Sequence, residues 1–115
     1  MTILHLALES DWVAAVASGS YRVSTLGQTF DEVGFVHCST PEQVAGVAAR
    51  FYAHVTDPLL LLAIDADAVR AAGTAIVFED GGDGELFPHV YGPIEPAWVR
   101  EATRARIVSG LLVVG

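Results

Sequence analysis

The stretch GFVHCSTPEQVAGVAARF, residues 34–51, predicts a strand that runs directly into a helix. In residues 34–39, strand alternation places His37 on one face and Val36 and Cys38 on the other. Val36 and Cys38 are expected to face the core, since a lone buried cysteine behaves as a small apolar residue. His37 is therefore expected to point away from the apolar side of this strand.

The helix is predicted to begin at Thr40. Thr40 is a favoured N-cap residue, Pro41 suits the first helical position, and Gln43 completes a capping box. The apolar residues that follow have the i, i+3, i+4, i+7 spacing of one buried helical face: Val44, Val47, Ala48 and Phe51.

The remaining chain contains more strand patterns than helix patterns. Strands are expected at residues 3–8, 21–23, 59–65, 75–79 and 111–114, with short helices at 11–17 and 65–72. Residues 59–65 are apolar on both faces, as in a central strand, whereas residues 98–107 fit a helix or a strand. Residues 85–94 are extended but contain Pro88 and Pro93, which predict an edge strand or a bulge. The mixed order of elements favours an α+β fold.

Length and composition predict a single domain, residues 1–115, with a net charge of −8. No apolar run is long enough to span a membrane, the N-terminus lacks signal-peptide features, and Cys38 is the only cysteine. These features predict a cytoplasmic protein without a membrane anchor. All six basic residues are arginines, too few for a phosphate-binding face, so binding of nucleic acid is not expected.

Two segments combine residues that could carry chemistry. In the sequence ELFPHVYGP, residues 85–93, alternation places Glu85, His89 and Tyr91 on one face, which suits acid–base work or polar-ligand binding. An edge strand with polar residues in water is the structural alternative. In residues 34–51, Ser39 and Thr40 lie at a helix N-terminus, where backbone N–H groups favour a phosphate or carboxylate. Arg22 and Arg50 are the cations available to neutralise such an anion.

Three of the four histidines, His5, His37 and His89, fall in predicted strands. Polar side chains on otherwise apolar strand faces need partners if they are buried. We expect His5 and His37 to face a common cleft, and a metal site formed by all three imidazoles is an alternative.

The combination of motifs resembles the bacterial domain-of-unknown-function family 952 over nearly the whole chain. The resemblance is carried by the following residues: His5, Trp12, Tyr21-Arg22, GFVHCSTPEQ at 34–43 and ELFPHVYGP at 85–93. That family is grouped with ADP-ribosyltransferases, which bind NAD in the cleft of a split β-sheet. Its two-histidine pattern is most similar to that of RNA 2′-phosphotransferases. The resemblance implies a split, mostly antiparallel sheet with two or three helices.

The resemblance also implies roles for individual residues. His5 corresponds to the histidine that holds the NAD ribose, and His37 to a position where many relatives stack a tyrosine on nicotinamide. Glu85, with His89 as the alternative, is the candidate for the third catalytic position. The residues expected to contact NAD, a small phosphate-bearing ligand, are His5 and His37 from the resemblance, together with those that the residue patterns suggest: Arg22, Ser39, Thr40, Arg50 and Tyr91. The implied activity is cleavage or transfer at the ribose–nicotinamide bond, and a ligand-sensing or protein-interaction domain without catalysis is the alternative.

Overall fold

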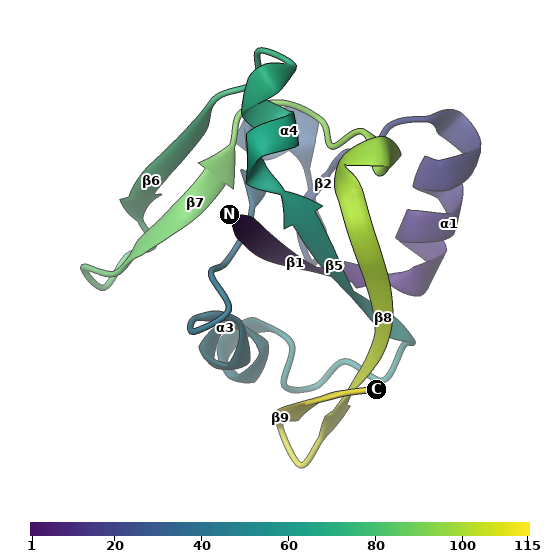
Figure 1. Ribbon diagram of the computed structural model, residues 1–115. Coiled ribbons are helices and arrows are strands. Elements are labelled where there is room, and N and C mark those ends of the chain that lie inside the picture. Colours follow the sequence, from purple (N-terminus) through teal and green to yellow (C-terminus); the bar gives the residue numbers. More distant parts are fainter.

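The centre of the fold is a four-stranded antiparallel sheet with strand order β1-β5-β8-β9 (Figure 1). The computed structural model describes residues 1–115. The strands are β1 (Thr2–Leu8), β5 (Leu59–Asp65), β8 (Val99–Val108) and β9 (Leu111–Val114). β5 lies between β1 and β8, which confirms the central strand predicted from its two apolar faces.

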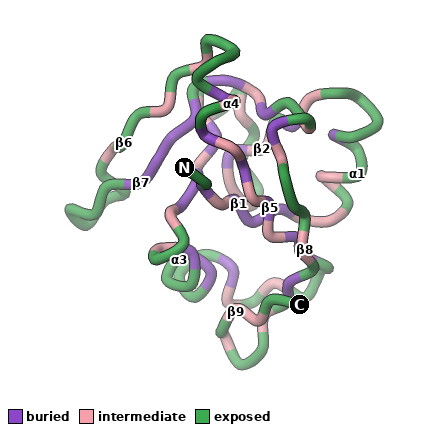
Figure 2. Tube along the Cα trace, in the orientation of Figure 1, coloured by how far each residue is buried: buried purple, intermediate pink, exposed green.

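Both faces of this sheet are covered by helices, so the protein has two core layers. β5 directs Leu62 to one layer, which it shares with α1 (Glu9–Ser18) and α4 (Ala66–Ala71). It directs Leu59 to the other layer, which includes α3 (Val44–Phe51). Figure 2 shows the buried segments concentrated in β1, β5 and β7. Because both faces are buried, either face of β1 can hold a residue that never meets solvent.

A second, three-stranded sheet has the order β4-β7-β6 and is also antiparallel. Its strands are β4 (Val36–His37), β7 (Leu86–Val90) and β6 (Ile76–Asp80), and a separate pair is formed by β2 (Val23–Thr25) and β3 (Gln28–Thr29). Leu4 and Ser39 join the two larger sheets through two backbone hydrogen bonds of 2.7 Å. The α+β class and the mostly antiparallel pairing are therefore confirmed.

The expectation that residues 85–94 form an edge strand or a bulge is wrong, because β7 lies in the middle of its sheet. The N–H and C=O of one residue point to the same side of an antiparallel strand. The Pro88 carbonyl accepts from Cys38 N, just beyond the end of β4. Pro88 therefore lacks its N–H on the side of β7 that faces the chain just beyond the end of β4. The hydrogen bonds between β7 and β6, on the other side, are unaffected.

Four α-helices are present, one more than the patterns predicted. The additional helix, α2 (Phe30–Val33), lies where a loop was expected and has a complete capping box between Thr29 and Glu32. The sequence carries the matching T-x-x-E signal at residues 29–32. Of the ambiguous residues 98–107, Trp98 ends a 3-10 helix (Pro96–Trp98) and residues 99–107 lie in β8.

α3 begins at Val44, three residues later than predicted. Thr40 does not cap it, because residues 41–43 form a turn and the Thr40 hydroxyl makes no cap bond. Gln43 instead accepts from Thr40 N through Oε1 at 3.0 Å and donates through Nε2 to the Leu86 carbonyl at 2.7 Å. Only half of the capping box forms, and Gln43 uses its second amide atom to hold the start of α3 against β7. Phe51, predicted to be core, is 51% exposed.

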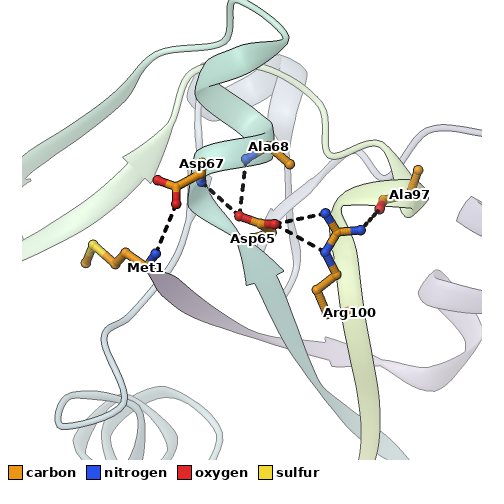
Figure 3. A network of polar contacts seen from close by, with 6 residues as sticks. All are labelled: Met1, Asp65, Asp67, Ala68, Ala97 and Arg100. Atoms are coloured by element: carbon orange, nitrogen blue, oxygen red, sulfur yellow. Dashed lines mark hydrogen bonds and ion pairs between the residues drawn. The ribbon is translucent and has the colours of Figure 1, made fainter.

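A polar network lies at the end of the central sheet where β5 leads into α4 (Figure 3). Asp65 caps α4 by accepting from Asp67 N and Ala68 N, as expected for a helix starting there. Its second oxygen accepts from Arg100 of β8 at 2.8 Å. The N-terminal amine of Met1 lies 3.4 Å from Asp67. The ends of β1, β5 and β8 are thereby tied to one helix.

None of the helices combines the length and the apolar character that crossing a membrane requires.

The contacts of Gln43 lead to a prediction about α3. Gln43→Ala removes two hydrogen bonds and should lower the free energy of unfolding by about 1–2 kcal/mol. Thr40→Ala removes no cap bond and should cost less than about 0.5 kcal/mol. Urea denaturation of the two variants measures both changes, and a larger loss for Thr40→Ala would contradict this description of the helix start.

Candidate functional site

A cavity of about 570 Å³ lies beside α3 and the second sheet. Its wall combines residues from six parts of the chain: Ser24 of β2, Phe35 before β4, His37 of β4, Arg50 of α3, Asp83 and Glu85 of the β6–β7 turn, and His89 of β7. Volumes of about 300–1,000 Å³ are usual for small-molecule sites. The cavity is therefore the candidate functional site.

A hydrogen-bonded chain of three side chains reaches this wall. Glu79 Oε1 lies 2.8 Å from His89 Nδ1, and His89 Nε2 lies 3.3 Å from His37 Nδ1. β6 and β7 bring Glu79 and His89 together, since Val77 pairs with His89 and Glu79 lies two residues further along the same face. β4 and β7 bring the two histidines together, because His37 pairs directly with His89.

The direction of these hydrogen bonds determines whether His37 Nε2 carries a proton or a lone pair. A carboxylate only accepts, so His89 must donate from Nδ1 to Glu79. When His89 is neutral, its Nε2 is then an acceptor and His37 donates from Nδ1. His37 Nε2 is left with a free lone pair. That atom is buried and has no hydrogen-bond partner in the protein.

Aromatic residues hold this chain in place. Phe35 stacks on the His89 ring with centroids 3.9 Å apart and planes 14° from parallel. The Tyr91 hydroxyl donates to Glu79 Oε1. The hydrogen bonds from Tyr91 and then from His89 lower the pKa of Glu79, which keeps it a carboxylate at neutral pH.

His37 is neutral at physiological pH. Burial, followed by the nearby His89 and His5, lowers its pKa to about 4. A neutral imidazole offers a lone pair at Nε2, which can accept a hydrogen bond or a proton. His37 is thus an acceptor held in a cavity wall.

His5 does not line the cavity, so the expected common cleft with His37 is not formed. It is 3% exposed, and both ring nitrogens have protein partners: Nδ1 donates to the His37 carbonyl at 2.6 Å, and Tyr21 Oη donates to Nε2 at 2.8 Å. The prediction took the His5 face of β1 to be the open one. That face packs in the core with Ile3 and Ala7, because both faces of β1 are covered.

The other predicted site residues divide between the cavity and the rest of the surface. His37, His89, Glu85 and Arg50 line the cavity. Arg50 Nη1 lies 3.0 Å from Oδ2 of Asp83, a residue of the β6–β7 turn. The remaining residues lie outside the lining: Arg22, which pairs with Asp31; Ser39, in the bridge to Leu4; Thr40; and Tyr91. Cys38 is fully buried, as predicted, and burial raises the pKa of its thiol.

The alternative of a three-histidine metal site does not fit the geometry. His5 has no free ring nitrogen, and no group of three or more histidine, cysteine or acidic side chains is arranged to hold a metal ion.

Sequence reasoning missed Glu79 and Ser24. Glu79 was assigned to a strand, but its pairing with His89 depends on the register of the β6–β7 hairpin, which the Gly/Asp turn alone does not specify. Ser24 gives no signal in the sequence. Its hydroxyl is buried, has no partner and belongs to the cavity lining.

These features define an α+β protein with a cavity beside a histidine pair. The chain matches the family described as "Protein of unknown function (DUF952)" over residues 6–102 and belongs to that family. It is similar to the solved structure of protein CC0527 from Caulobacter crescentus, with a TM-score of 0.83, 26% identity, and coverage of 98% of this chain and 94% of that chain. A double mutant of CC0527 gives a TM-score of 0.82 at the same identity and coverage. No curated protein matches the chain.

The buried His5 makes stability depend on pH. Burial lowers its pKa from 6.5 to about 4 in the folded protein. Below pH 6.5 the unfolded chain takes up a proton that the folded protein does not bind until about pH 4. Stability should therefore be complete above pH 6.5 and fall by up to about 3 kcal/mol toward pH 4.

His5→Gln separates this effect from the loss of contacts. Glutamine keeps a donor and an acceptor but does not titrate, so the variant should be less stable at pH 7 and lose less stability on acidification. Urea titrations at pH 4.5, 5.5, 6.5 and 7.5 measure both. Parallel pH profiles for the variant and the natural protein would contradict the burial of a neutral His5.

Proposed function

We propose that the cavity binds a hydroxyl-bearing small molecule through His37, and that this molecule is NAD or another ADP-ribose-type ligand. One observation carries the proposal: Nε2 of His37 is buried without a partner in a residue that lines the cavity. Buried polar atoms are nearly always paired, so an unpaired one needs an explanation. A hydroxyl of a bound ligand provides the missing hydrogen.

The resemblance to ADP-ribosyltransferases supports NAD as the ligand, with roles adjusted to the cavity. The ribose-holding role implied for His5 passes to His37, because both ring nitrogens of His5 are already bonded. Glu85 is a carboxylate at the cavity that can face positive charge, and Arg50, once released from its pair with Asp83, is the cation that can meet a phosphate. The cavity volume of about 570 Å³ suits the nicotinamide–ribose half of NAD, with the pyrophosphate at the rim.

The proposed reaction is cleavage or transfer at the ribose–nicotinamide bond. The bond from ribose C1′ to nitrogen breaks and its electron pair leaves with nicotinamide. The oxygen of water or of an acceptor hydroxyl bonds to C1′, and its proton is released to solvent. Glu85 stabilises the positive charge that develops at C1′. With a pKa of about 4, His37 is a weak base, so it orients a ribose hydroxyl and does not remove a proton.

Binding tests the role of His37. NAD should raise the melting temperature of the natural protein, and calorimetry should give a measurable dissociation constant. His37→Asn keeps a polar atom near the position of Nδ1 but lacks Nε2, and should weaken binding by about tenfold through loss of one ligand hydrogen bond. His54→Gln, an exposed histidine outside the cavity lining, is the matched control and should bind as the natural protein does.

Chromatography of free nicotinamide then distinguishes an enzyme from a binding domain. Release that stops in Glu85→Gln supports the reaction, whereas binding without release supports a ligand sensor. Equal binding by His37→Asn and the natural protein, or no response to NAD, ADP-ribose or nicotinamide, would contradict the proposal.

A further inference from the structure

The cavity wall carries an excess of negative charge. Three carboxylates, Asp80, Asp83 and Glu85, line it, and Arg50 is the only basic residue in its lining. Arg50 already pairs with Asp83 at 3.0 Å, which leaves Asp80 and Glu85 without a cation. His37 adds no positive charge, because burial lowers its pKa to about 4. An anion entering the cavity therefore meets repulsion and must compete with Asp83 for Arg50.

The same wall is aromatic. Phe35, Phe51 and Phe87 line the cavity. Phe51 is 51% exposed although its helical spacing predicts a core position, so the core does not account for it. The Arg50 guanidinium lies 5.4 Å from the centre of the Phe51 ring, so the aromatic faces left for a ligand cation are those of Phe35 and Phe87.

Two residues of this wall have a buried polar atom without a partner. Ser24, 1% exposed, has a hydroxyl without a partner, and so has His37 Nε2. They are the only buried side-chain polar atoms in the protein without one, and both residues line this cavity. Hydroxyl or amide groups of a bound molecule would supply the missing partners.

We infer that the site selects its ligand by positive charge and takes hydroxyl-bearing organic cations. This inference rests on the proposed ligand site and narrows its substrate class. The carboxylates and phenylalanine faces attract the cation, while His37 and Ser24 pair with its hydroxyl groups. For an NAD-type ligand, the oxidised nicotinamide–ribose end enters the cavity, and the pyrophosphate contributes little affinity.

Two matched pairs of compounds test the charge. Oxidised nicotinamide riboside is a cation, and its reduced form is a neutral molecule of nearly the same shape. Choline is a hydroxyl-bearing cation, and 3,3-dimethylbutan-1-ol is its neutral isostere. Calorimetry should give roughly tenfold tighter binding for the cation of each pair. ADP-ribose, an anion, should bind more weakly than oxidised nicotinamide riboside.

Charge variants locate the effect in the cavity. Glu85→Gln should reduce the cation preference by roughly threefold. Glu101→Gln makes the same change of charge on an exposed residue of β8 that is absent from the lining, and should leave the preference unchanged. Equal effects of the two variants would attribute the preference to the net charge of the protein and overturn the inference.

The inference and the proposed function fail in different ways. Equal affinity for the cation and the neutral partner in both pairs, or tighter binding of ADP-ribose, overturns the inference while His37-dependent binding of NAD still supports the proposed function. A cation preference for choline without any binding of nicotinamide compounds supports the inference and removes NAD as the ligand. Binding of none of these compounds overturns both.

Discussion

The two larger sheets depend on one buried join beside β1. Leu4 and Ser39 exchange two backbone hydrogen bonds, and His5 Nδ1 donates to the carbonyl of His37, two residues before Ser39. β4 is only two residues long, so its own pairing with β7 cannot fix it firmly. The imidazole of His5 supplies a further contact and continues to the Tyr21 hydroxyl. His5 therefore acts on the cavity indirectly, by holding the backbone from which His37 projects.

The cavity is the place where this fold leaves polar groups unpaired. The other buried histidines have partners: His5 has two, and His89 contacts both Glu79 and His37. Only the Ser24 hydroxyl and His37 Nε2 are left, on the same cavity. An unpaired buried group costs about 1–3 kcal/mol, and the proposed ligand would supply the missing partners.

Much of the fold could be predicted from the sequence, because periodicity reports burial directly. The central strand Leu59–Asp65 and the buried face formed by Val44, Val47 and Ala48 follow from spacing alone. What failed were judgements that depend on neighbours in space. The His5 face of β1 is covered by a second core layer, and Pro88 occupies a central strand because β4 ends beside it. Of the site, His37, His89, Glu85 and Arg50 were predicted, whereas Glu79 required the register of a hairpin.

The central claim is that His37 is a neutral acceptor whose free nitrogen awaits a ligand. The most direct measurement is the ¹⁵N spectrum of its imidazole at pH 7, in which protonated and lone-pair nitrogens have distinct shifts. We predict a proton on Nδ1, directed at His89, and a lone pair on Nε2. An imidazolium ring, or a proton on Nε2 of a neutral ring, would contradict the account.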